Sequence, residues 1–240
     1  KNITQSGKMT FGEIIFFKTG ISNSQVAMVE GYLQDKWKVD DGIVLADHKF
    51  KDKASDFSER QRGADVTLYY GISDGGEDTG AWDNNINLGK SYAAPNLPSY
   101  SGLELWLNAD KLSGSVGDVV TSWDDQSGNG NHADNASGAP VIKSFNGHNI
   151  IAFNADGGKD DLLYTSRNFD NLTNGYTLFS VSRYVGNPKG RLISSKTTNW
   201  LWGYHSNKVN QWHPNGWVSN HGGSDTNWHL HSGHITNAGD

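Results

Sequence analysis

Short strand-like runs separated by turns fill the second half of this 240-residue chain. Residues 102–109 place a leucine at every second position, which is the side-chain period of a strand. Further candidates are Val119–Trp123, Val141–Phe145, Ile150–Phe153, Tyr176–Tyr184, Arg191–Ser194 and Trp200–Tyr204. No helical pattern interrupts them, so residues 98–240 are expected to form an antiparallel β-sandwich or jelly roll.

The composition supports an all-β fold. The chain contains 29 glycines and nine each of Trp, Tyr and Phe, although only 35% of its residues are hydrophobic. Glycine supplies the positive φ angles that tight turns require, and aromatic side chains fit the half-buried surface of a sheet.

Residues 1–40 predict one more strand followed by the one helix of the chain. The run at residues 12–18 is short and β-rich. Between residues 22 and 38, apolar residues recur at spacings of three and four and would form one face of a helix. They are Val26, Val29, Tyr32, Leu33 and Trp37. Ser22 or Ser24 is the expected N-cap.

Residues 41–97 are expected to be a β-rich linker. Two weaker strand candidates, at residues 65–70 and 82–88, flank a polar loop at residues 73–78. Pro95 and Pro98 mark the end of this segment.

Charge and residue usage exclude several classes of protein. The net charge is −6 and no Lys/Arg cluster is visible, so a nucleic-acid partner is not expected. No apolar run approaches the roughly 20 residues needed to span a bilayer, so membrane insertion is not expected. The absence of cysteine excludes disulfides, Cys-ligated zinc and thiol catalysis.

Three motifs carry a resemblance to a known family. They are residues 102–109, the W-x-D-x-S-G-x-G-N pattern at Trp123–Asn131, and the N-G-x-x-x-x-x-F pattern that ends at Phe153. Together they resemble the start of bacterial laminin-G-like domains of the concanavalin A-like lectin/glucanase superfamily. The resemblance implies that residues 98–240 are the N-terminal two-thirds of such a jelly roll. Residues 1–40 would then be a last strand and closing helix, and residues 41–97 a partial fibronectin-type-III-like insert.

In this resemblance, the residues that match the end of the domain precede those that match its start, and there are two explanations. The chain could be a window cut from a tandem array, in which residues 1–40 finish one module and residues 98–240 begin the next. Alternatively, residues 1–40 supply the missing strand to residues 98–240, within the chain or from a neighbour. We favour the window.

The superfamily includes glycosidases, which place two carboxylates about 5 Å apart on one strand. That arrangement needs an E-x-D-x-E or E-x-D-x-x-E run. The chain has five glutamates, Glu13, Glu30, Glu59, Glu77 and Glu104, and none lies in such a run. We therefore expect no catalytic residues and no enzymatic activity.

Two loops are candidates for calcium, which prefers several oxygen ligands close together. The first candidate set is Asp124, Asp125, Asn129 and Asp134, with Asn131 beside them, and a second contains Asp156, Asp160 and Asp161. The alternative is that these side chains bond local backbone N–H groups in tight turns. No cofactor is required, and Ca²⁺ is the ion that these loops would suit.

Residues 199–234 are rich in tryptophan and histidine. Because indole faces stack on sugar rings, Trp200, Trp202, Trp212 and Trp217 are candidates for carbohydrate binding, with burial in the core as the alternative. His229 and His231 would share one strand face, which is the geometry of a bidentate transition-metal site. No carboxylate partner for them is evident from the sequence.

These observations lead to a hypothesis about function. We expect a non-catalytic structural or adhesive module of a large bacterial protein, located outside the cell or on its surface. Its partners would be neighbouring copies or modules of the same protein, which assemble head to tail into a filament, and glycans. The alternative is a carbohydrate-binding, lectin-like module of a secreted polysaccharide-degrading protein.

Overall fold

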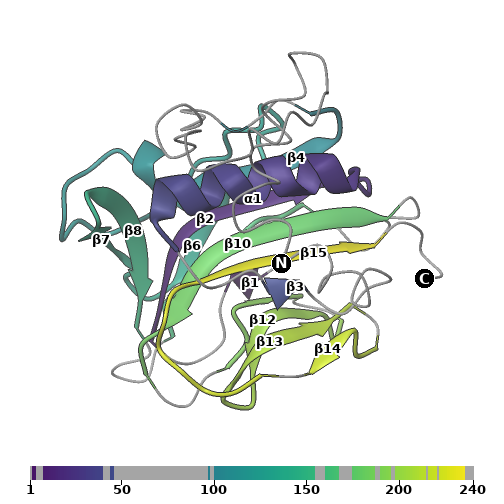
Figure 1. Cartoon of the computed structure of the whole chain (residues 1–240). Coiled ribbons are helices and arrows are strands. Elements are labelled where there is room, and N and C mark those ends of the chain that lie inside the picture. The colour runs from purple at the N-terminus through teal and green to yellow at the C-terminus, as the bar shows by residue number, and fades with distance from the viewer. Residues whose placement is uncertain are drawn as a thin grey trace, which may run out of the picture.

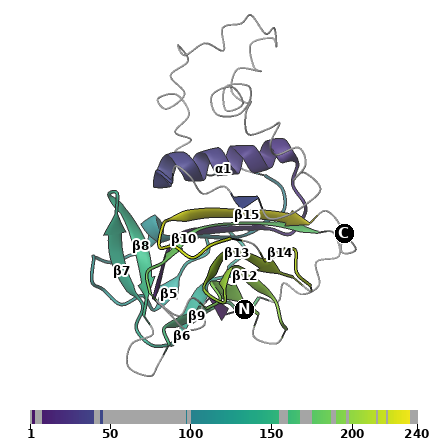
Figure 2. The same cartoon turned by 60° about the horizontal axis from the view of Figure 1, so that its bottom comes forward.

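The computed structural model describes residues 2–3, 8–39, 44–45, 97, 100–154, 160–167, 175–186, 190–195, 198–214, 216–220 and 222–235. In this part of the chain, helix α1 (Asn23–Trp37) lies against the outer face of one β-sheet. A second sheet packs on the opposite face of the first. The three layers are seen from the side in Figure 2.

The helix-side sheet contains the longest strands. Its order is β3 (Val44–Leu45), β15 (His229–Ile235), β10 (Tyr176–Tyr184), β2 (Met9–Phe17), β8 (His148–Phe153) and β7 (Val141–Phe145). Strand β4 (Leu103–Asn108) also pairs with β2, on the side that β8 occupies. Its pairings are antiparallel apart from the short β3–β15 contact, which is parallel.

The second sheet is built from shorter strands. Its order is β14 (Ser219–Asn220), β13 (Lys208–His213), β12 (Leu201–His205), β11 (Ile193–Ser194), β1 (Asn2–Ile3), β9 (Leu162–Tyr164), β6 (Ala133–Ser137) and β5 (Ser122–Trp123). A 3₁₀ turn, η3 (Ala109–Lys111), follows β4. The prediction of an all-β fold with antiparallel sheets is confirmed.

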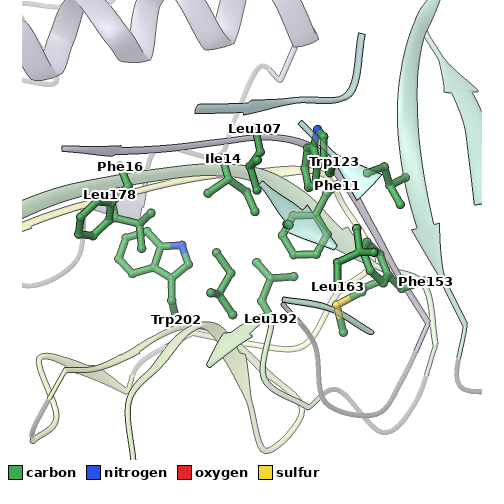
Figure 3. Packing of buried hydrophobic residues seen from close by; sticks show 14 of the residues in the cluster. Phe11, Ile14, Phe16, Leu107, Trp123, Phe153, Leu163, Leu178, Leu192 and Trp202 are labelled. Carbon is green, nitrogen blue, oxygen red and sulfur yellow. The ribbon is translucent and has the colours of Figure 1, made fainter. Parts of the chain in front are cut away.

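The main hydrophobic core lies between the two sheets. In Figure 3, Ile14 and Phe16 of β2 point toward the second sheet, from which Trp202 and Leu192 rise to meet them. Gly233 of β15 makes room here, because a Cβ atom at this position would lie within 2.8 Å of the Trp202 and Trp212 rings. Each large side chain buried in this way contributes roughly 1.5–3 kcal/mol.

The predicted helix is confirmed. Ser22 is its N-cap and forms a capping box with Gln25, while Lys38 ends it in the left-handed conformation. Its apolar face packs on the outer side of the sheet in a second cluster that includes Leu33 and Trp37. The Trp37 ring lies directly on β2, at a place where Gly12 has no side chain to obstruct it.

Strand β2 occupies a central position in the helix-side sheet (Figure 1). It pairs with β10 along one side, and with β8 and then β4 along the other. All nine of its residues are buried. In this structure the first 40 residues therefore supply a strand to the sheet that residues 103–235 form, within one chain.

Most of the predicted strands are present, with shifted ends. The strand predicted at Val119–Trp123 is shorter in the structure. Only Ser122–Trp123 forms a strand, and Val119 makes an isolated bridge to Val141. Strands β1, β3, β6, β9, β13 and β14 are not predicted from the sequence. The candidate strands at residues 65–70 and 82–88 lie outside the described residues.

One carboxylate lies at the contact between α1 and β15. Glu30 is 8% exposed, and its Oε1 accepts a hydrogen bond of 2.6 Å from the Ser232 hydroxyl. Burial raises the pKa of Glu30 to about 7, although the Ser232 hydrogen bond acts in the opposite direction. The folded protein therefore holds a proton that the unfolded chain releases near its ordinary pKa of 4.5.

This difference predicts a pH-dependent stability. Because the unfolded state binds fewer protons between about pH 4.5 and 7, Glu30 should lower the free energy of unfolding as pH rises through that range. Glu30→Gln keeps the acceptor for Ser232 and cannot ionise, so it should remove a loss of roughly 2–3 kcal/mol. Denaturant unfolding of both proteins across this range tests the prediction, and parallel pH curves would contradict it.

Candidate functional site

The carboxylate of Glu13 is buried between β2 and helix α1. Its side chain is fully inaccessible to solvent and accepts four hydrogen bonds. The donors are the Tyr32 hydroxyl at 2.9 Å, Lys36 Nζ at 2.9 Å, Trp37 Nε1 at 2.9 Å and Trp106 Nε1 at 2.6 Å. A charge can remain in such a place only when it is paired and fully hydrogen-bonded.

Lys36 extends this network from the helix to the strand that follows the linker. Its Nζ donates to Asn108 Oδ1 at 2.8 Å and lies 3.3 Å from Asp110 Oδ2. The ammonium therefore joins Glu13, on one side of the linker, to Asn108 and Asp110 on the other. It is 13% exposed, so solvent screens these contacts only weakly.

Asp110 completes the network at its edge. The Asn149 N–H donates to Asp110 Oδ1 at 2.8 Å, and His148 Nδ1 lies 2.8 Å from Oδ2. Burial alone would raise the pKa of Asp110, but these two hydrogen bonds and the charge of Lys36 outweigh it and lower the pKa. We call the group of Glu13, Lys36, Trp106, Asn108 and Asp110 the polar joint.

A second ionic contact connects the same two parts of the chain. Glu104 of β4 is 5% exposed, and its carboxylate lies 3.2 Å from Lys18 Nζ and 2.8 Å from Arg167 Nη2. Glu13 and Glu104 thus lie on different strands, and each carboxylate is paired with cations or N–H donors.

The W-x-D-x-S-G-x-G-N motif forms a loop that is latched onto β4. Asp125 is buried, and its carboxylate accepts bonds from the N–H groups of Trp106, Ser127 and Asn131 and from the Ser127 hydroxyl, all between 2.7 and 2.9 Å. The side-chain amide of Asn131 donates to the Glu104 carbonyl at 2.8 Å. The motif residues thus satisfy backbone groups of the loop and of the strand beside it.

The four residues predicted to bind calcium lie in different settings. Asn129, like Asn131, turns its amide nitrogen toward carbonyls of β4. Asp124 is exposed and accepts from the Ser122 hydroxyl, while Asp134 lies on β6, paired with Ser122 and Tyr164. Calcium here stays a prediction, and in the structure the Asp125 carboxylate accepts four hydrogen bonds from the protein.

The second predicted calcium loop is only partly described. Asp161 is buried, and the N–H groups of Ala139 and Asn154 donate to its carboxylate at 2.6 and 2.8 Å. Asp160 is exposed, and Asp156 lies outside the described residues. Within the described segments, no group of three or more His, Asp or Glu side chains is arranged to hold a metal ion.

Three of the four tryptophans predicted to bind carbohydrate belong to the core, which corrects that interpretation. Trp200, Trp202 and Trp212 are 8%, 2% and 1% exposed. The indole N–H of Trp200 donates to the Tyr176 hydroxyl and that of Trp202 to Ser180 Oγ. Their alternation on the strands turns them toward the other sheet, so their faces are covered by neighbouring side chains.

Trp217 lies on the surface instead. It is 48% exposed, and its ring centre is 5.8 Å from that of His205 and 5.0 Å from that of His213. Partial burial and the neighbouring Arg191 and His213 side chains lower the pKa of His205. We call Trp217, His205 and His213 the aromatic patch.

No family model, curated protein or solved structure matches this chain. No helix of the described segments has both the length and the apolar character needed to cross a membrane. Interpretation of the site therefore depends on its geometry.

Sequence reasoning did not identify the polar joint. Two signals were present: Glu13 interrupts the β-rich run of β2, and Tyr32 and Lys36 are four residues apart, on one face of the helix. Trp106 lies 93 residues beyond its partner Glu13, and Asn108 lies 72 residues beyond its partner Lys36. Nothing local in the sequence indicates this pairing.

The polar joint predicts that Lys36 and Lys38, two residues apart in the sequence, differ greatly in their contribution to the free energy of unfolding. Lys36→Met leaves the Glu13 carboxylate buried without its cation and should lower the free energy of unfolding by roughly 3–5 kcal/mol. Lys38 is 62% exposed and, among the described residues, pairs with Asp35 at the surface, so Lys38→Met is the matched control, with an effect within about 0.5 kcal/mol. Denaturant unfolding measures both, and equal effects would contradict the role of the joint.

Proposed function

We propose that this chain is a non-catalytic structural and adhesive module of a large extracellular bacterial protein, which assembles head to tail by strand exchange. Residues 8–39, here called the closing element, carry β2 and α1. The observation that supports the proposal is the central position of β2, between β10 on one side and β8 and β4 on the other. The laminin-G-like jelly roll and the bacterial surface location come from the resemblance of the motifs.

Exchange is favoured by what the sheet would lose without β2. The facing edges of β10 and β4 would both be open, with unpaired backbone groups that form a ready template for an incoming strand. A second copy of the chain carries the same closing element. Because β2 inserts at the centre, the exchanged strand would pair on both sides.

The polar joint gives this exchange chemical selectivity. Any copy of the two-sheet body presents Trp106, Asn108 and Asp110 in the same places. An incoming strand that lacked the Glu13 carboxylate, or a helix that lacked Lys36, would leave buried polar groups unpaired at a cost of about 1–3 kcal/mol each. The joint therefore discriminates in favour of copies of this chain.

The connection between the two parts is long enough to reach a neighbour. Residues 46–96 separate β3 from Leu97, and at roughly 3.3 Å per residue a chain of this length has a maximum span on the order of 170 Å. Exchange of an identical element between copies is a low-cost route to oligomers. Repetition along a filament would raise the avidity of any adhesive contact.

Introduced cysteines can trap the exchange, because the chain has no native cysteine. Val185 N–H donates to the Lys8 carbonyl at 2.8 Å, and both positions are exposed. Lys8→Cys and Val185→Cys chains, unfolded and refolded together at high concentration, should form a disulfide-linked mixed dimer. The Lys8→Cys/Val185→Cys double variant, which should close within one chain, shows that the two positions can bridge.

Two outcomes decide the result. A mixed dimer in clear excess over the dimers that each single variant forms alone supports exchange of the closing element. If the double variant closes within the chain and the mixture stays monomeric at every concentration, exchange does not occur and the proposal of head-to-tail assembly fails.

A second candidate function, a carbohydrate-binding module, is favoured by the exposed face of Trp217 between two imidazoles. If the aromatic patch stacks on a sugar ring, Trp217→Ala should weaken glycan binding several-fold, by about 0.5–1.5 kcal/mol or more. Val116→Ala is the control, because Val116 is 62% exposed and lies outside the patch. A glycan array measures both, and absence of binding by the unmodified protein excludes this candidate.

A further inference from the structure

An imidazole without partners is buried between the two sheets. His231 of β15 is 3% exposed, and neither of its ring nitrogens has a hydrogen-bond partner among the described residues. Burial, with a smaller effect from His229, lowers the pKa of His231 to about 3, so the ring is neutral at pH 7. A buried polar group left unpaired destabilises the folded state, and its presence needs an explanation.

A second imidazole lies beside it on the same strand face. The ring centres of His229 and His231 are 5.6 Å apart, and His229 is 9% exposed. His229 Nε2 lies 2.8 Å from Asp225 Oδ1. An ionised carboxylate only accepts, so Nε2 carries the proton and, in the neutral ring, Nδ1 keeps its lone pair. That Nδ1 is also buried without a partner in the described structure.

A tyrosine of the other sheet packs against the two histidines. Tyr204 of β12 is fully buried, with its ring centre 5.4 Å from that of His231 and 6.1 Å from that of His229. With metal–nitrogen bonds of about 2.1 Å, two imidazoles that share a tetrahedral ion have ring centres roughly 5–6 Å apart. The spacing of the three rings therefore suits one ion between them.

We propose that His229, His231 and Tyr204 bind a first-row transition-metal ion such as Cu²⁺ or Zn²⁺, with Asp225 orienting His229. Imidazole nitrogens favour these ions, and a carboxylate on the far nitrogen of a metal-binding histidine fixes its tautomer and raises its basicity. Two of the proposed ligands are imidazoles and the third is a phenol. The site therefore does not need three His, Asp or Glu ligands.

The charge of the site is compatible with a divalent ion. A bound cation would displace the phenolic proton of Tyr204, because a metal ion binds the deprotonated form of its ligand. Phenolate and Asp225 would then balance the two positive charges of the ion. The inference is independent of strand exchange, because it concerns β12 and β15 alone.

The experiment uses the full chain, freed of metal with a chelator and refolded with Cu²⁺, Zn²⁺ or Ca²⁺ alone. We expect one equivalent of Cu²⁺ or Zn²⁺ per chain, with Cu²⁺ bound more tightly and Ca²⁺ not bound at this site. Either bound ion should raise the unfolding temperature. Binding should also release a proton, which calorimetry in buffers of different ionisation enthalpy detects.

Variants distinguish this site from histidines on the surface. His231→Gln should weaken binding at least tenfold, and Asp225→Asn roughly 10–100-fold. Tyr204→Phe should remove the phenolate-to-copper absorption band while the chain stays folded by circular dichroism. His132→Gln is the matched control, because its side chain is 48% exposed. Its affinity should equal that of the unmodified protein.

Two results would overturn the inference. One is a folded, unmodified protein that takes up no stoichiometric Cu²⁺ or Zn²⁺ during refolding. The other is a folded His231→Gln variant that binds as tightly as the unmodified protein, which would assign the ion to other residues.

Discussion

The Glu13 carboxylate and the four donors around it are the interaction on which the described structure depends. These hydrogen bonds join β2, α1 and β4, although β2 and α1 precede residues 41–97 in the sequence and β4 follows them. Because these groups are buried, removal of any donor leaves polar groups without partners and destabilises the folded state. The hydrophobic clusters on the two faces of β2 then stabilise a strand whose position the polar joint helps to specify.

This organisation connects the fold to the proposed function. In the proposed assembly the closing element comes from a neighbouring copy, which carries the same residues and so can form the same contacts. The choice then depends on concentration and on the reach of the linker. Trp217 lies in the connection between β13 and β14 of the second sheet, whereas the helix and the polar joint lie at the helix-side sheet. Adhesive contacts there would leave the closing element undisturbed.

Local patterns in the sequence predicted the helix and the long strands, and the reasons are local. The spacing of Val29, Leu33 and Trp37 defines a helical face, and Ser22 with Gln25 defines its start. Strands β6 and β9 are short or polar, and they are held in the sheet by pairing with each other and with their outer neighbours β5 and β1. Alternation also showed that Trp200 and Trp202 share a face, but which face is buried depends on the opposite sheet.

The sites show the same division. The sequence placed His229 and His231 on one strand face, but Asp225 and Tyr204 join them only through a turn and through packing between sheets. The residues of the W-x-D-x-S-G-x-G-N motif suited either calcium or a turn, and only the positions of the N–H donors around Asp125 distinguish these uses. Trp106 reaches Glu13 across a separation of 93 residues, beyond any periodic pattern.

The central claim is that Glu13 and Lys36 act as one unit that holds the closing element in the sheet. A double-mutant cycle with Glu13→Gln, Lys36→Met and the combined variant measures this directly in the free energy of unfolding. We predict that the double variant loses much less than the sum of the single variants, with a coupling free energy of roughly 1.5–3 kcal/mol. Single effects that add within about 0.5 kcal/mol would show that the two residues are independent and would contradict the account.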